Sequence, residues 1–243
     1  MAGRGRIRGN KARSGQAVGA SKAAGSKRSE GHASDRKALW TWGILVAILL
    51  LGGALRVSYL REIVDHPDFS LPQIDPCYHD YWARGIATGD WTVPKNLSGW
   101  TDPQIRSTPY LRPPGYPFFL AGIYAVTGGS YLGARIVQMA LGLINCVLAY
   151  LLGRRIFGAA TGLIFAFLMS FYWVFIYFEG ELLAPVLLVT LGLLLLYVLS
   201  LWVDRFTFGR GLAAGILVGL FALVRTNILL FVPIVLGWAW WVA

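Results

Sequence analysis

Long apolar runs separated by short polar stretches make up most of the chain after residue 37. A helix needs about 20 consecutive apolar residues to cross a bilayer. Runs that come close to this length lie at about 39–60, 131–153, 157–178, 182–203, 210–226 and 228–243. They are continuous rather than alternately apolar and polar, which favours helices over the strands of a barrel. The pattern predicts an all-α polytopic membrane protein with about six transmembrane helices.

The segment between the first two runs differs from the rest. Residues 61–112 are not continuously apolar, and the apolar stretch 116–126 is short and is bounded by a proline and a pair of glycines. Stretches of this length more often lie at the membrane surface than span it. If 116–126 does not cross, Arg154, Arg155, Arg205 and Arg210 lie on the same side as the basic N-terminal residues, as the positive-inside rule requires. We therefore expect a first external loop, 61–130, that holds juxtamembrane helices.

Composition and charge agree with a membrane protein. Hydrophobic residues make up 56% of the chain and charged residues 14%, against about 25% charged residues in soluble domains. The net charge is +10, and most of it lies in residues 1–37, which are otherwise rich in Gly, Ser and Ala. We expect a disordered, cytoplasmic, basic tail that contacts anionic lipid in the inner or plasma membrane. No aromatic residue interleaves with these charges, which argues against nucleic acid as a partner.

The cysteines and histidines predict neither a disulfide nor a metal centre. Cys77 falls in the loop and Cys146 in the middle of a run, so they are not expected to pair. No metal-ligand spacing relates Cys77 to His66, His79 or His32. We predict no cofactor, and a role for a divalent metal stays open.

Asp75 is the first acid to consider as a catalytic group. Asp75-Pro76 precedes apolar residues that recur every four positions, and Gly89 follows them, which predicts a short amphipathic helix. Asp75 has two interpretations: the N-cap of this helix, or a general base at the boundary of water and membrane. The spacing alone favours the cap.

Further charged residues fall on the same predicted side. Arg112, before two prolines, is suited either to holding a phosphate or to ordinary snorkelling at the interface. Arg135 lies one turn inside a span, where a charge needs a partner, and we expect it to pair with Glu179 or Glu181. Arg225 and Asn227 interrupt two apolar runs at the same level.

The order of these features resembles the GT-C membrane glycosyltransferases, specifically the family 39 or protein-mannosyltransferase-like group with its RgtA/B/C/D-like domain. The similar elements are Asp75-x-x-Tyr78-His79-x-x-Trp82-Ala83, Gly89-Asp90, Arg112-Pro-Pro-Gly-Tyr-Pro, Ala134-Arg135-Ile-Val-Gln138, Gly153-Arg-Arg-Ile-Phe-Gly158, Phe178-Glu-Gly-Glu-Leu-Leu183 and Arg225-Thr226-Asn227. Seven elements in this order, over roughly residues 39–235, carry the resemblance.

The resemblance implies a cell-envelope enzyme that transfers a sugar from a polyprenyl-phosphate carrier to a lipid, glycan or protein acceptor at the outer membrane face. Asp75 would be the general base. The substrate-binding residues would be Tyr78, His79, Arg112, Arg135, Glu181, Arg225 and Asn227. It also implies that residues 38–243 form a GT-C-like transmembrane domain.

Two other interpretations remain. The last run stops at Ala243 without a polar flank, and the family's usual chain is longer, so we expect a C-terminal truncation and consider an inactive fragment. A non-enzymatic membrane protein, such as a transporter or an assembly subunit, is the second. A transporter would favour inverted repeats and helices broken at mid-membrane, and the sequence shows neither.

Overall fold

The computed structural model describes residues 39–92 and 112–242. It divides into two compact units, residues 1–46 and 47–243, and all contacts given below lie within the second unit. The predicted disordered tail, 1–37, and the part of the predicted loop at 93–111 lie outside the described residues. Regular structure in the described part is helical throughout, which confirms the all-α prediction.

Short helices occupy the predicted loop. The N-terminal helix, Leu39–Ile63, is followed by α2 (Pro67–Ser70), α3 (Asp75–Thr88) and α5 (Gly115–Thr127). Gly89 ends α3 with φ of 75°, and Gly128 ends α5 with φ of 67°, a left-handed conformation that glycine adopts without steric cost. The 13 residues of α5 rise about 20 Å. This is short of the roughly 30 Å of a hydrocarbon core and agrees with a juxtamembrane helix.

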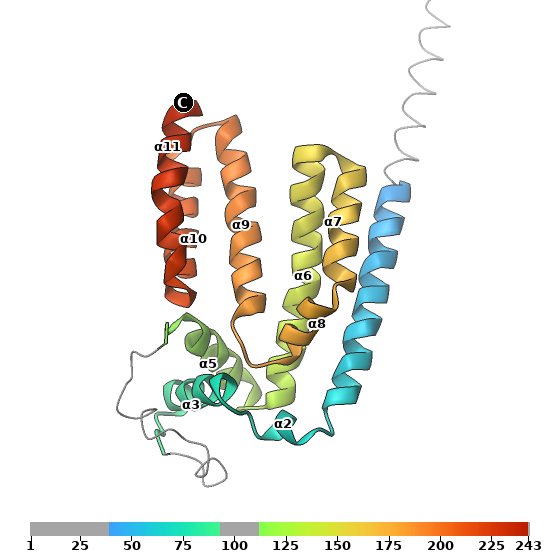
Figure 1. Ribbon diagram of the computed structural model, residues 1–243, viewed down its shortest axis with the longest axis vertical. Coiled ribbons are helices and arrows are strands. Elements are labelled where there is room, and N and C mark those ends of the chain that lie inside the picture. Colours follow the sequence, from blue (N-terminus) through green and yellow to red (C-terminus); the bar gives the residue numbers. More distant parts are fainter. Residues whose placement is uncertain (1–38, 93–111, 243) are drawn as a thin grey trace, which may run out of the picture. The chain divides into compact units, whose positions relative to one another are not determined.

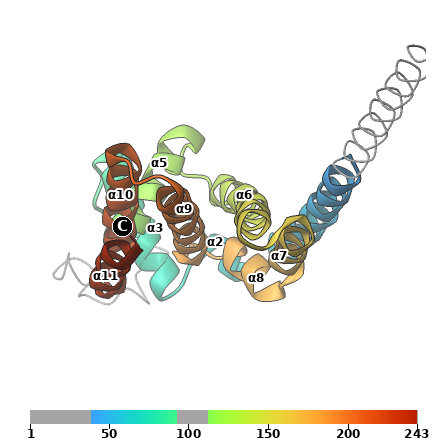
Figure 2. The same ribbon diagram turned by 90° about the horizontal axis from the view of Figure 1, so that it is seen from above.

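The helices that follow α5 are, in chain order, α6 (Tyr131–Phe157), α7 (Ala159–Phe171), α8 (Trp173–Gly180), α9 (Pro185–Asp204), α10 (Phe208–Val224) and, after the 3-10 helix η2 (Thr226–Phe231), α11 (Val232–Val242). They run alternately in opposite directions, except that α8 continues α7 after a bend (Figure 1). Figure 2 shows α10, α9, α6 and α7 one after another in a row. The helices α3 and α5 lie at one end of these helices, the end at which α6 and α9 begin and α10 ends (Figure 1).

Helices occur at all six predicted runs, although they differ in length. In the described residues three helices are long and apolar enough to cross a membrane: Leu39–Ile63, Tyr131–Phe157 and Pro185–Asp204. The pair α7 and α8, bent by 51°, makes a fourth if it counts as one span, while α10 and the last apolar stretch are shorter. The chain is therefore an integral membrane protein. The predicted span over 157–178 is formed by two helices rather than one, because the helix breaks at Tyr172.

Packing around α5 attaches the loop helices to the long helices. Tyr116 and Leu120 of α5 are buried with Ala83 of α3, Ala134 of α6 and Val224 of α10. At the start of α5, a Cβ added to Gly115 would lie 2.7 Å from the carbonyl carbon of Leu223. A side chain at this position would separate the two helices. Glycine here therefore lets the beginning of α5 rest directly on the end of α10.

At the opposite end of the long helices, α6 is tied to α9. Arg155 forms an ion pair with Asp204 and donates hydrogen bonds to the Oγ and the carbonyl oxygen of Ser200, at 2.8 and 3.0 Å. The charged residues that end α6 and α9 therefore share one end of the bundle, as the positive-inside argument expects.

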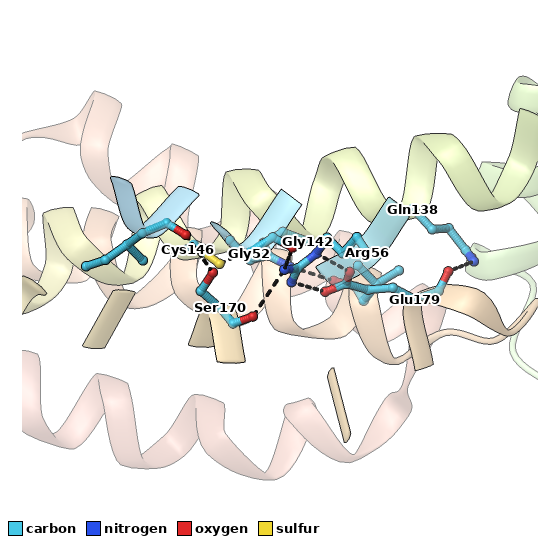
Figure 3. Close-up of polar contacts among 10 residues, drawn as sticks. Gly52, Arg56, Gln138, Gly142, Cys146, Ser170 and Glu179 are labelled. Carbon is cyan, nitrogen blue, oxygen red and sulfur yellow. Dashed lines mark hydrogen bonds and ion pairs between the residues drawn. The ribbon is translucent and has the colours of Figure 1, made fainter. Parts of the chain in front are cut away.

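A second ion pair lies inside the bundle (Figure 3). Arg56, of the N-terminal helix, donates its Nε and Nη2 to the two carboxylate oxygens of Glu179 in α8, at 2.6 and 2.7 Å. The two side chains are 2% and 4% exposed. Arg56 also donates to the carbonyl oxygens of Gly52 and Ser170. A Cβ on Gly142 would lie 2.1 Å from Oε1 of Glu179, so glycine in α6 makes room for the carboxylate.

Candidate active site at the start of α3 and α5

The residues of α3 separate onto two faces with different partners. Successive residues of an α-helix are rotated by about 100°, so Asp75, His79 and Trp82 fall on one face within about 60° of each other. Asp80 and Arg84 fall on the opposite face. We call the first set the Asp75 face and the second the Asp80 face.

Every oxygen of the Asp80 carboxylate has a hydrogen-bond partner. Asp80 is 0% exposed and accepts hydrogen bonds from the hydroxyls of Tyr124 in α5, at 2.6 Å, and Tyr131 in α6, at 2.9 Å. Arg84 donates its Nε to both carboxylate oxygens at 3.0 Å and its Nη2 to the carbonyl oxygen of Gly129. A buried charge with this many partners fixes one helix against two others. The Asp80 face is therefore structural.

On the other face, Asp75 forms an ion pair with Arg112. Both side chains are more than one third exposed, at 36% and 39%, so the pair is open to solvent. The guanidinium of Arg112 also lies 5.9 Å from the centre of the Tyr78 ring. The N-cap interpretation of Asp75 is wrong: the cap is Ile74, and Asp75 is the first residue inside the helix. The Asp75 carboxylate has a charged partner instead of a capping role.

Aromatic rings and two unpartnered polar atoms surround this ion pair. The Tyr78 and Trp82 rings stack at 5.7 Å, and His79 meets the edge of Tyr116 at 4.8 Å. His79 Nδ1 and Trp82 Nε1 are buried without a hydrogen-bond partner, which costs about 1–3 kcal/mol for each such group. Burial, assisted by the charge of Arg112, lowers the pKa of His79 from 6.5 to about 4. The imidazole is therefore neutral at physiological pH.

Two side chains of α6 hold the turn between α8 and α9. Gln138 donates its amide to the carbonyl oxygens of Glu179 and Glu181 at 2.9 and 2.7 Å, and Arg135 donates its Nε to that of Gly180 at 2.7 Å. Gln138 also accepts a hydrogen bond from the hydroxyl of Tyr116 at 2.5 Å. Three consecutive carbonyls are thus bound to α6, which in turn contacts α5.

The expected pairing of Arg135 with Glu179 is wrong, because Glu179 is bound by Arg56. Arg135 bonds backbone carbonyls instead, including that of Phe69 in α2, and its guanidinium carbon lies 3.9 Å from the centre of the Phe69 ring. Arg135 acts on Glu181 through its charge. Burial raises the pKa of Glu181, and the opposing charge of Arg135 is not sufficient to cancel this rise.

Arg225 and Asn227 lie at the end of the long helices that carries the site. Arg225 ends α10 and precedes η2, directly after the residues that touch Gly115 of α5. Arg225 and Asn227 are both exposed. The structure thus brings Asp75, Tyr78, His79 and Arg112 together. Glu181 lies on the turn that Arg135 of α6 binds, and Arg225 and Asn227 lie at the margin.

Sequence reasoning missed several residues that organise this end of the molecule. Arg56 was passed over within an apolar run, although a lone arginine inside a span is itself a signal of a buried partner. Tyr124 and Tyr131 gave no signal, since tyrosines at membrane boundaries are common. Gln138 was part of a quoted motif but received no role.

Neither a disulfide nor a metal cluster is found in the described ranges. Cys77 and Cys146 are both free and buried, which confirms that they do not pair. No group of three or more His, Cys, Asp or Glu side chains in residues 39–92 and 112–242 is close enough to hold a metal ion.

The described residues thus form a helical integral membrane protein that carries an exposed carboxylate–guanidinium pair beside its apolar helices. Residues 111–243, more than half of the chain, match the family model described as dolichyl-phosphate-mannose-protein mannosyltransferase. The chain belongs to this family and is a glycosyltransferase of the GT-C type. No curated protein and no solved structure matches it.

Proposed function

We propose that this protein transfers a sugar from a polyprenyl-phosphate-linked donor to a hydroxyl of a lipid, glycan or protein acceptor, with Asp75 as the general base. The observation that carries the proposal is the Asp75–Arg112 ion pair. It combines a carboxylate that can accept a proton with a guanidinium that can bind a phosphate. Both are open to solvent and are held beside the ends of apolar helices, where a lipid-borne substrate presents its head group.

The reaction needs both members of this pair. The acceptor hydroxyl gives its proton to the Asp75 carboxylate while its oxygen attacks the anomeric carbon of the sugar. The bond between that carbon and the phosphate oxygen breaks, and its electron pair stays on the polyprenyl phosphate. Arg112 offsets the negative charge that develops on this leaving group. Before this can happen, the phosphate must draw Arg112 away from Asp75, so donor binding frees the base.

The remaining candidates support substrate binding around this pair. Tyr78 and His79 line the same part of α3. Arg135 binds the carbonyl oxygen of Gly180 and acts on the neighbouring Glu181 through its charge, and we assign the Glu181 carboxyl to the binding of acceptor hydroxyls. Arg225 and Asn227, at the exposed end of α10, are suited to the polar part of the carrier.

The proposal includes a topology. Residues 1–37 form a cytoplasmic tail, the loop 61–130 and the site face outward, and residues 38–243 form the GT-C-like domain of an inner or plasma membrane protein. It is supported by the common end shared by Arg155 and Asp204, opposite to the end of α3 and α5.

Replacing Asp75 with asparagine tests the base. Asparagine keeps the shape of the side chain but accepts no proton at neutral pH, so transfer from labelled polyprenyl-phosphate mannose should fall by about 100- to 10,000-fold. The matched control is Asp204→Asn, because Asp204 is also the carboxylate of an exposed ion pair but lies at the other end of α9, away from the site. Transfer retained in folded Asp75→Asn would exclude Asp75 as the base.

Arg112→Ala tests the phosphate contact separately. We expect weaker binding of polyprenyl phosphate itself, because the guanidinium would no longer meet the phosphate. Unchanged affinity for this lipid would assign Arg112 to an interfacial role only.

A further inference from the structure

The two faces of α3 differ in how completely their polar atoms are used. On the Asp80 face, the Asp80 carboxylate and the Arg84 guanidinium are bonded to α5, α6 and the turn between them. On the Asp75 face, His79 Nδ1 and Trp82 Nε1 have no partner, and they make up two of the three such buried side-chain atoms in the described part of the chain. Buried polar atoms are nearly always hydrogen-bonded. Two exceptions on the face of a candidate base indicate that this face binds a polar ligand.

The chemistry of these two atoms selects among ligands. The indole of Trp82 can only donate a hydrogen bond, whereas a neutral imidazole has one donor and one acceptor nitrogen. The pKa of about 4 keeps His79 uncharged, so it adds no positive charge that would attract a phosphate. Arg112 already supplies that charge beside Asp75. A hydroxyl, which both donates and accepts, suits the His79–Trp82 pair better than an anion does.

The surrounding rings add the apolar surface that sugar rings require. Trp91 meets the edge of Trp82 at 5.9 Å and is 45% exposed. Its position is set from α3: Tyr81 donates its hydroxyl to the carbonyl oxygen of Trp91 at 2.8 Å, and a Cβ on Gly85 would lie 2.3 Å from the Trp91 ring. The Trp91 ring therefore packs directly against Gly85, where any side chain would displace it. The exposed part of the ring faces solvent beside the site.

We propose that His79 Nδ1 and Trp82 Nε1 form a subsite for hydroxyl groups of the donor's sugar, with Trp91 as its aromatic wall. This inference rests on the proposed function, since Arg112 would hold the phosphate to which that sugar is attached. Both atoms are buried, so sugar binding at this subsite includes a movement of Arg112, the exposed neighbour of Tyr78, toward the phosphate.

The test separates sugar binding from binding of the lipid phosphate. The affinities of the full chain in nanodiscs are measured for polyprenyl phosphate and for polyprenyl-phosphate mannose, and the ratio gives the contribution of the sugar. Trp82→Phe removes the N–H and keeps an aromatic ring. It should reduce the ratio by about two- to tenfold, the range of one hydrogen bond, and leave the affinity for polyprenyl phosphate unchanged. Trp202→Phe, in α9 beside Phe206, is the matched control and should change neither value.

A second pair of variants tests the imidazole. Asparagine at position 79 places an amide near the location of Nδ1, whereas leucine removes the polar atom. His79→Asn should therefore keep more of the sugar's contribution than His79→Leu. If these variants do not fold, the wild type is titrated with donor analogues in which single sugar hydroxyls are replaced by hydrogen, and loss of at least one hydroxyl should lower the ratio by the same factor.

Each result decides the question. Equal weakening of both lipids by Trp82→Phe, or no weakening, would overturn the subsite. A wild type that binds the two lipids equally well would overturn it while leaving the phosphate site intact. A wild type that binds neither lipid would remove the proposed function itself, and the subsite with it.

Discussion

Replacing Glu179 with glutamine should destabilise the protein far more than an equivalent change at the exposed end of the bundle. Glutamine preserves the shape of Glu179 but leaves the guanidinium of Arg56 buried, at 2% exposure, without a countercharge. The remaining partners of Arg56 are the carbonyl oxygens of Gly52 and Ser170 (Figure 3). Removing one member of a buried ion pair costs about 3–5 kcal/mol, which is a large share of the stability of a typical domain.

The two members of the pair should respond differently to pH. A guanidinium stays charged, so the cost of Glu179→Gln should not depend on pH. In Arg56→Met the carboxylate left behind can be neutralised by a proton. With a reference pKa of about 4.3, this uptake costs about 4 kcal/mol at pH 7 and about 1 kcal/mol at pH 5. The defect of Arg56→Met should therefore shrink by up to about 3 kcal/mol between pH 7 and pH 5.

Unfolding in mixed micelles of mild and denaturing detergent measures these free energies. Asp204→Asn is the matched control, because it removes a carboxylate from an ion pair whose side chains are 27% and 59% exposed, and it should cost less than about 1 kcal/mol. The double variant Arg56→Met with Glu179→Met buries no charge, and its cost should be well below the sum of the single variants. A cost for Glu179→Gln as small as that of the control would refute the reasoning.

Two further predictions concern α3. Tyr124→Phe removes a 2.6 Å hydrogen bond to the buried Asp80 carboxylate, so the free energy of unfolding should fall by about 1.5–3 kcal/mol in the same assay; an unchanged value would show that Tyr131 and Arg84 are sufficient. The pKa of His79 is lowered from 6.5 to about 4, so the folded state binds its proton less tightly than the unfolded state. Stability should therefore decline by about 3 kcal/mol as the pH falls through this interval, and His79→Gln should lack this part of the decline.

The sequence predicted α3 well because its signals are local. Aromatic and apolar residues recur every four positions, proline stands in the first turn, and Gly89 ends the helix in the left-handed conformation. The same holds for α5, whose length and bounding glycines are visible in the chain. The position of Asp75 was off by one residue, because Ile74, with φ of 53°, rather than the acid precedes the first turn. Such an error is within the usual uncertainty of helix ends.

The break between α7 and α8 was not predictable from the same signals. Residues 157–178 form a continuous apolar run, and Tyr172, where the helix bends by 51°, carries no mark of a helix end. Proline and glycine are the usual local causes of a kink, and neither lies at this position. The ion-pair partner of Glu179 was also not predictable from the sequence. Arg56 and Glu179 are 123 residues apart, so only the packing of the helices shows that Glu179 pairs with Arg56 and not with Arg135.

The case for Asp75 depends on this packing, because Asp75 precedes the part of the chain that matches the family model, which begins at residue 111. Hydrogen bonds from Tyr124 and Tyr131 to Asp80, and from Arg84 to the carbonyl oxygen of Gly129, attach the Asp80 face of α3 to the matched part. The Asp75 face meets the matched part through the ion pair between Asp75 and Arg112. A helix that served only to cover the ends of the bundle would have no need to keep unpartnered polar atoms on that second face. The polar character of this face therefore supports the proposed role of α3 in substrate binding.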